Sequence, residues 1–142
     1  MRDDIMYRTT ATSWGGRQGR AVTDDERLDL DLSVPAEMGG DGGAGTNPEQ
    51  LFAAGWSACF HSALKGAARQ QKVDVADSAV STTIGVQRFD AGGGLTARIE
   101  VEAPGLEPDV AQGLVDQAHQ MCPYSRATRG NIDVEVLVVQ GE

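Results

Sequence analysis

The sequence predicts an α+β fold in which antiparallel sheets surround a buried central helix. Segments of alternating apolar and polar residues, typical of half-buried strands, occur before residue 35, between residues 80 and 101, and after residue 131. A long apolar segment at residues 48–71 and a second helical segment from Glu107 separate these groups. The resulting order is strands, helix, strands, helix and strand.

The N-terminal part predicts antiparallel strands joined by a glycine-rich turn. The alternation is clearest in LDLDLSV, where the leucines and Val34 share one face and the polar residues share the other. WGGRQGR, residues 14–20, interrupts the pattern with three glycines and predicts a hairpin turn or loop that carries Arg17 and Arg20. A second glycine-rich segment, GGDGGAG at residues 39–45, predicts a flexible loop before the first helix.

The segment from Pro48 to about Gln71 predicts one long helix. Asn47 is a candidate N-cap, Pro48 suits the first helical position, and Gln50 can close a capping box. Two neighbouring stripes at i, i+4 spacing make the helix apolar over most of its circumference, which predicts a central position. The stripe of small residues includes Cys59, and the stripe of large residues consists of Phe52, Trp56, Phe60 and Leu64.

The rest of the chain predicts three strands and a second helix. Residues 80–86 and 95–101 alternate and are joined by DAGGG, so we expect them to pair antiparallel. The helix that starts near Glu107 is limited by Pro123, and YSRAT predicts a short further turn. Residues 132–139 predict the last strand.

Length and charge limit the classes of function. A chain of 142 residues fits a single domain, residues 1–142, that can bury a core. The net charge of −9 repels phosphate backbones and anionic membranes, so we expect neither nucleic acid nor membrane as a partner. MRDDIMYRTT lacks the apolar core of a signal peptide, and no segment reaches the roughly 18 apolar residues of a spanning helix, so we expect a cytoplasmic protein.

In the cytoplasm the two cysteines, Cys59 and Cys122, are expected to be buried thiols, metal ligands or a catalytic redox pair. Separate buried thiols are the simplest interpretation, since free cysteine is among the most buried residue types. A metal site is disfavoured, because Cys59 and His61 lie about 200° apart around a helix. His119 and Cys122 can share an ion, but two ligands do not make a site. We therefore expect no metal.

A thiol peroxidase requires a cation that stabilises a thiolate, a second thiol that traps the sulfenic acid, and an apolar pocket. Lys65 lies about 9 Å along the helix from Cys59, so an arginine of the loop, Arg17 or Arg20, is the better cation. Glu49 lies about 15 Å from Cys59 along the helix and needs a bridging group to act with it. Candidate pocket residues are Phe52, Trp56, Phe60 and Met121.

Two segments resemble the paired cysteine motifs of the organic hydroperoxide resistance proteins, the Ohr branch of the Ohr/OsmC family. They are TNPEQLFAAGWSACF, residues 46–60, and HQMCPYSRATRGNIDVEV, residues 119–136. GGRQGRA, residues 15–21, resembles that family's arginine loop. The chain departs from the family pattern at Trp56, where tyrosine is common, and at Gln18, where an acidic residue is frequent. Neither departure removes a reacting group.

The resemblance implies that Cys59 is the peroxidatic cysteine, Cys122 the resolving one, Arg17 the catalytic arginine and Glu49 the glutamate that orients it. It also implies an intertwined homodimer of OsmC-like subunits with active sites at the dimer interface. The expected substrates are organic and fatty-acid hydroperoxides, and the expected reductant is a dihydrolipoyl group, free or on a lipoylated protein. We expect no cofactor. Two alternatives are a peroxidase of the OsmC branch and a non-enzymatic dimeric protein that binds an apolar ligand.

Overall fold

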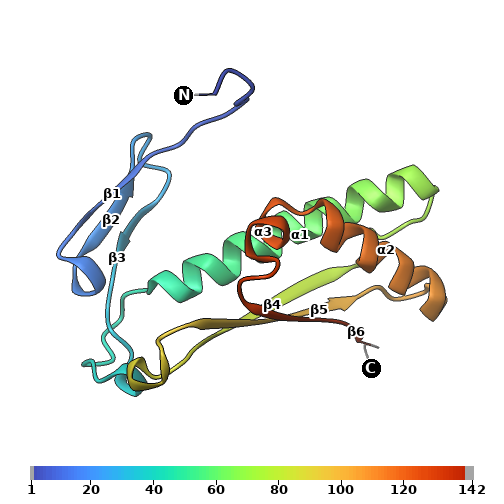
Figure 1. Ribbon diagram of the computed structural model, residues 1–142. Helices are drawn as coiled ribbons and strands as arrows, with labels where there is room; N and C mark the ends of the chain where they lie inside the picture. Colours follow the sequence, from blue (N-terminus) through green and yellow to red (C-terminus); the bar gives the residue numbers. More distant parts are fainter. Residues whose placement is uncertain (1, 140–142) are drawn as a thin grey trace. The chain divides into compact units, whose positions relative to one another are not determined.

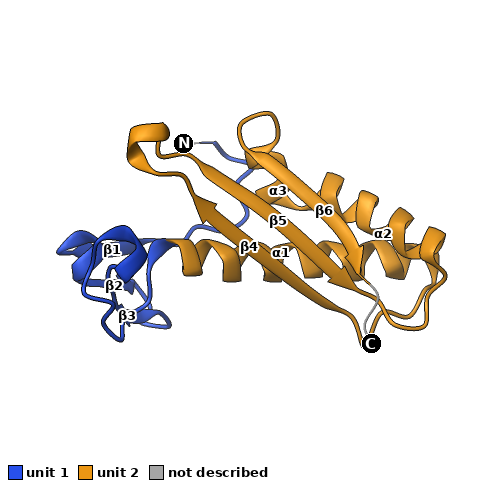
Figure 2. Ribbon diagram, turned by 90° about the horizontal axis from the view of Figure 1, so that it is seen from below, with its two compact units in different colours: residues 1–48 blue, residues 49–142 orange. Residues whose placement is uncertain are grey.

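The structure is a computed structural model that describes residues 2–139. It divides into two compact units, Met1–Pro48 and Glu49–Glu142 (Figures 1 and 2). The second unit contains both cysteines and the long helix. The assignment of residues 1–142 to one domain stays a prediction.

Unit 1 is a three-stranded antiparallel sheet, as its alternating sequence predicted. Strands β1 (Ala11–Trp14), β2 (Arg20–Thr23) and β3 (Asp29–Asp31) lie in that order. A short 3-10 helix, Gly16–Gln18, forms the turn between β1 and β2. This turn requires glycine, because a Cβ at Gly19 would lie 1.6 Å from the Trp14 carbonyl oxygen. A second 3-10 turn, Ala36–Met38, follows β3.

Unit 2 packs three helices on one face of a three-stranded sheet (Figures 1 and 2). The helices are α1 (Pro48–Gln71), α2 (Pro108–Met121) and α3 (Pro123–Thr128). The strands are β4 (Ala79–Val86), β5 (Leu95–Glu102) and β6 (Asp133–Val139), and a 3-10 turn, Phe89–Ala91, lies between β4 and β5. Proline occupies the first position of all three helices, where its missing N–H costs no helical hydrogen bond.

The sheet of unit 2 is mixed, whereas the sequence predicted antiparallel sheets. β4 and β5 form the expected antiparallel hairpin, from Val86 opposite Leu95 to Ala79 opposite Glu102. β6 pairs with β5 in parallel, with Ile99 opposite Val136. The reason lies in the connection, because α2 and α3 carry the chain back across the sheet before β6 begins, as a parallel pair requires.

The core of unit 2 lies between the sheet and the helices. Trp56 and Phe60 of α1, Ile99 of β5, and Leu114 and Val115 of α2 have no exposed surface. Burial of each such side chain stabilises the fold by about 1.5–3 kcal/mol. The opposite face of α1 is exposed in the single chain and consists largely of small residues, at Ala54, Ala58 and Ser62.

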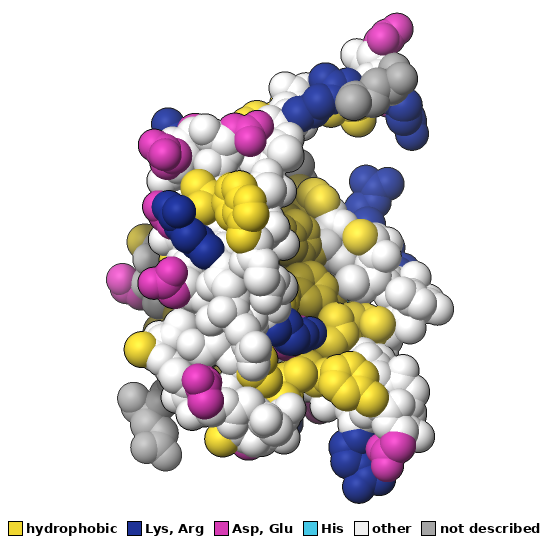
Figure 3. Space-filling view, turned by 90° about the vertical axis from the view of Figure 1, so that its left-hand side faces the viewer, with side chains coloured by type: hydrophobic (Ala, Val, Ile, Leu, Met, Phe, Trp, Pro, Cys, Tyr) yellow, Lys and Arg dark blue, Asp and Glu magenta, His cyan; other side chains and the backbone are white. Residues whose placement is uncertain are grey.

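No helix within residues 2–139 is both long enough and apolar enough to cross a membrane. On the face drawn in Figure 3, acidic and basic side chains are interspersed and hydrophobic side chains lie between them. The excess of acidic residues in the composition therefore does not produce a continuous acidic surface on that face.

Candidate active site

The fold brings the two cysteines together although 63 residues separate them in the sequence. The Sγ atom of Cys122 lies 3.4 Å from the Sγ atom of Cys59, in hydrogen-bond geometry, and both cysteines are free thiols. Cys59 is half-buried in the middle of α1, whereas Cys122 has no exposed surface. A disulfide has an S–S length of about 2.05 Å, so a small approach of the two sulfur atoms suffices to form one.

Cys122 lies at the corner between α2 and α3. Its backbone N–H donates to the Ala118 carbonyl and completes the last turn of α2 at 2.8 Å. Its own backbone is extended, with φ −65° and ψ 122°, because the following Pro123 disfavours helical geometry at the preceding residue. The Cys-Pro sequence therefore ends one helix, starts the next, and directs the Cys122 thiol toward α1.

A second link joins α1 to α3 one helical turn from the thiols. The Trp56 indole N–H donates to the Ser125 hydroxyl at 3.2 Å, and neither residue has exposed surface. The Phe52 ring stacks on Trp56 with centroids 5.3 Å apart and lies 5.9 Å from the Tyr124 ring. Gly55 leaves room for that tyrosine, since a Cβ there would lie 3.1 Å from the Tyr124 hydroxyl oxygen.

The electrostatic surroundings of Cys59 within the described residues favour the neutral thiol. Burial raises the pKa of the Cys59 thiol, and the neighbouring Cys122 raises it further. A hydrogen bond from the backbone of Tyr124 acts in the opposite direction. A peroxidatic role for Cys59 therefore requires a positive charge near the sulfur.

His119, one turn before Cys122, has an unusual environment. Its Nδ1 atom is buried and has no hydrogen-bond partner within residues 2–139, and its ring centroid lies 6.3 Å from that of Phe60. Burial, followed by the charge of Arg129, lowers the pKa of the His119 imidazole, while Asp116 opposes the shift. The Arg129 guanidinium donates to the His119 carbonyl at 2.7 Å and so caps the end of α2.

The two loop arginines that the sequence offered as cations have different settings. Arg17 lies half-buried in the 3-10 turn of unit 1. Arg20 makes two short hydrogen bonds to the Asp29 carboxylate, at 2.7 and 2.6 Å, which lower the pKa of that carboxyl. Glu49 occupies the first turn of α1, as expected, and is half-buried. Arg17 and Glu49 thus lie in different units.

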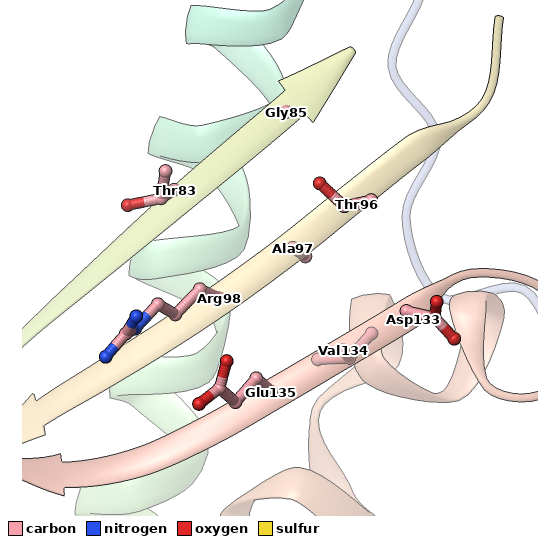
Figure 4. Close-up of a pocket in the computed structure, with 8 residues that line it drawn as sticks. All are labelled: Thr83, Gly85, Thr96, Ala97, Arg98, Asp133, Val134 and Glu135. Atoms are coloured by element: carbon pink, nitrogen blue, oxygen red, sulfur yellow. The ribbon is translucent and has the colours of Figure 1, made fainter. Parts of the chain in front are cut away.

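The four residues predicted to line an apolar pocket differ in exposure. Trp56 and Phe60 belong to the core and present no surface in the single chain, whereas Phe52 is half-buried and Met121 is 38% exposed. A depression of about 450 Å³ lies instead on the outer face of the sheet (Figure 4). Thr83, Arg98 and Glu135 line it, and it contains no cysteine. The substrate pocket stays a prediction.

Sequence reasoning missed Ser125 and Tyr124 as neighbours of the thiols. No local signal pointed to Ser125, because its partner Trp56 lies 69 residues away in the sequence. Among the described residues, no group of three or more His, Cys, Asp or Glu side chains is arranged to hold a metal ion.

Comparisons with known proteins show similarity to one family over nearly the whole chain. A family model described as "OsmC-like protein" matches residues 39–137. An organic hydroperoxide resistance protein from Xanthomonas axonopodis pv. citri is 48% identical over 133 residues, which cover 93% of this chain and 94% of that protein.

Solved structures of organic hydroperoxide resistance proteins have the same fold as this chain. An organic hydroperoxide resistance protein from Legionella pneumophila superposes with a TM-score of 0.90 at 42% identity, over 95% of this chain and 98% of that one. OhrB of Bacillus subtilis superposes with a TM-score of 0.86 at 39% identity, over 95% of this chain and 100% of that one. The chain therefore belongs to the OsmC-like family, in the branch of the organic hydroperoxide resistance proteins.

Proposed function

We propose that this protein is a two-cysteine peroxidase that reduces organic hydroperoxides, including those of fatty acids, to alcohols. The observation that carries the proposal is the 3.4 Å distance between the Sγ atoms of Cys59 and Cys122. A peroxidatic and a resolving cysteine have to approach each other to form a disulfide, and the fold already holds these two sulfur atoms close together. The names of the close relatives support the choice of organic hydroperoxides as the substrate class.

The proposed reaction has two steps. The Cys59 thiolate attacks the terminal peroxide oxygen, the O–O bond breaks, and the alcohol leaves with a proton while Cys59 becomes a sulfenic acid. The Cys122 sulfur then attacks the Cys59 sulfur, an S–S bond forms, and the S–O bond breaks to release water. Cys59 is the nucleophile in the first step because it is half-buried, whereas Cys122 has no exposed surface.

Arg17 is proposed to supply the positive charge that a Cys59 thiolate requires. A guanidinium stays charged at any working pH and offers several N–H donors. It can therefore stabilise both the thiolate and the negative charge that develops on the peroxide oxygen. Glu49 is proposed to orient it. The family resemblance matches Arg17, and not Arg20, to the catalytic arginine, and Asp29 binds the Arg20 guanidinium at two points.

The disulfide is proposed to be reduced by a dithiol such as dihydrolipoamide or a lipoylated protein, in the cytoplasm. A relative from Vibrio cholerae, 45% identical to this chain, carries captopril, a small organic thiol, in one of its active sites. This supports access of a small thiol to the corresponding site here. No cofactor takes part in the proposed cycle.

The first test uses the two cysteine variants. We expect the wild-type protein to reduce a fatty-acid hydroperoxide faster than hydrogen peroxide, and to accept dihydrolipoamide in preference to thioredoxin. Cys59→Ser should abolish peroxide consumption. Cys122→Ser should consume one equivalent to form the sulfenic acid, and a second where excess peroxide overoxidises Cys59 to the sulfinic acid, and then stop, because no second thiol traps the sulfenic acid. Full activity of Cys59→Ser would refute the mechanism, and a preference for hydrogen peroxide and thioredoxin would refute the assignment of substrate and donor.

The second test separates Arg17 from Arg20. We expect Arg17→Gln to lower kcat/KM for the organic hydroperoxide by about 100-fold, since loss of one group that stabilises a developing oxyanion commonly costs that much. Arg20→Gln is the matched control from the same turn and should retain most of the activity. Equal losses in both variants would show that the loop conformation, and not the Arg17 charge, is what matters.

The raised pKa of the Cys59 thiol supports one alternative function, that of a non-enzymatic binding protein. A non-enzymatic protein that binds an apolar ligand would keep both thiols inert. Titration of the Cys59 thiol by rate of alkylation distinguishes the two functions. A value well below the ordinary value of about 8.5 supports the peroxidase, and a value at or above it supports the binding protein.

A further inference from the structure

We propose that the hydrogen bond between Trp56 and Ser125 positions Cys122 for disulfide closure, so that these two side chains set the rate of the second chemical step. The inference rests on the proposed function, because it concerns the trapping of a Cys59 sulfenic acid by Cys122. It assigns a role to the one buried polar side chain that the structure describes, Ser125, and to the tryptophan that bonds it.

The placement of the bond is the first argument. Trp56 lies three residues before Cys59 on α1, and Ser125 lies three residues after Cys122. The segment from Cys122 to Ser125 is attached to α1 by the 3.4 Å contact between the sulfur atoms, by the 3.2 Å hydrogen bond, and by the hydrogen bond from the Tyr124 backbone to the Cys59 sulfur. The Trp56–Ser125 bond is the attachment that does not involve the Cys59 sulfur, so it fixes the register between the segments independently of the reacting atoms.

The directionality of the bond is the second argument. The aromatic contacts nearby, between Phe52 and the rings of Trp56 and Tyr124, tolerate sliding of one ring over another. An N–H···O bond weakens steeply when its geometry changes. Because Trp56 and Ser125 have no exposed surface, water cannot replace a lost partner, and departure from this register leaves a buried donor unsatisfied.

Loss of the Trp56–Ser125 bond should affect disulfide closure more than the oxidation of Cys59. Closure requires the Cys122 sulfur to attack the Cys59 sulfur, forming the S–S bond while the S–O bond breaks and the hydroxide leaves as water. Such a reaction is fast when the reacting atoms are held about 3–3.5 Å apart, which the observed sulfur distance satisfies. Cys122 is not a reactant in the first step and influences it only through the pKa of Cys59, so a shift of Cys122 affects this step much less than closure.

The test compares the two steps in the full-length protein with tert-butyl hydroperoxide as the probe. Rapid acid quench after one equivalent of peroxide separates sulfenic acid from disulfide by mass. We expect Ser125→Ala to slow closure by about tenfold or more, because small misplacements of reacting groups have effects of this size. The rate of Cys59 oxidation should stay within about twofold of wild type. The peroxide concentration that converts half of Cys59 to sulfinic acid should fall in proportion.

Three variants complete the design. Trp56→Phe removes the donor instead of the acceptor and should slow closure in the same way. The double variant, Trp56→Phe with Ser125→Ala, should close no more slowly than the slower single variant, because both changes remove one shared bond. Ser57→Ala is the matched control: it removes the Ser57–Thr82 hydrogen bond, 2.9 Å, which joins α1 to β4 rather than to the Cys122 segment. It should leave closure unchanged.

The outcomes are distinct. If wild-type protein forms no disulfide with peroxide, the proposed function fails and this inference fails with it. If wild-type protein forms the disulfide and Ser125→Ala closes equally fast, the inference alone is wrong. If Ser125→Ala slows Cys59 oxidation and disulfide closure equally, the Trp56–Ser125 bond contributes only to general stability, and the positioning role is wrong. The same conclusion follows if the control, Ser57→Ala, slows both steps equally.

Discussion

At the scale of single residues, His119 is a half-buried group whose charge state depends on the fold. Burial and Arg129 lower the pKa of its imidazole, so the folded protein favours the neutral ring. In the unfolded chain a histidine has a pKa of about 6.5. As pH falls below that value, the unfolded chain binds a proton that the folded protein resists, and the free energy of unfolding decreases until the folded pKa is reached.

We therefore expect the stability to decrease on acidification, and His119→Gln to remove much of the decrease. Urea unfolding between about pH 7.5 and about pH 5.5 measures the effect, because this range spans the unfolded pKa. His61→Gln is the matched control: it removes the other histidine, whose Nε2 lies 2.9 Å from the Ser78 hydroxyl. An identical pH dependence in wild type and His119→Gln would contradict the prediction.

At the scale of elements, two glycines of α1 have different neighbours. A Cβ at Gly66 would lie 3.7 Å from the Met121 Cε, an ordinary contact, whereas a Cβ at Gly55 would lie 3.1 Å from the Tyr124 hydroxyl oxygen. Glycine within a helix costs about 0.5–1 kcal/mol relative to alanine. Gly66→Ala should therefore raise the free energy of unfolding by that amount.

Gly55→Ala gains the same helix propensity, but Tyr124 must move away from α1, which offsets the gain. We expect no increase in stability, or a decrease, in urea unfolding of this variant. Since the backbone of Tyr124 also bonds the Cys59 sulfur, its displacement should weaken the one interaction in the described surroundings that favours the thiolate. Equal stabilisation by both alanines would show that Tyr124 does not pack closely on α1.

The elements also show what the sequence could predict. Pro48 located the start of α1, and the DAGGG segment located the β4–β5 hairpin, because helix starts and turns are local signals. The parallel pairing of β6 with β5 was not predicted, since it depends on a crossover through two helices. The motifs predicted that Cys59 and Cys122 form a pair, and their sulfur atoms lie 3.4 Å apart. The bond between Trp56 and Ser125 joins residues 69 apart, and no local pattern encodes it.

At the scale of the whole molecule, unit 1 lacks a hydrophobic core of its own. Leu32, 8% exposed, is the only buried hydrophobic residue among residues 2–48. Trp14 is 58% exposed and Leu28 is 48% exposed, although both belong to or adjoin its sheet. A three-stranded sheet needs an apolar face packed against another surface to be stable. The small residues Ala54, Ala58 and Ser62 of α1 are also exposed in the single chain.

Both features favour the homodimer that the family resemblance implies. Light scattering should give a mass of about twice 15.0 kDa. Because association stabilises only the folded state, the midpoint of urea unfolding should rise with protein concentration. In a monomer it would stay constant, since folding is then independent of concentration. A mass of 15.0 kDa together with a constant midpoint would therefore contradict the dimer. The exposed apolar side chains of unit 1 would then have no partner subunit to pack against.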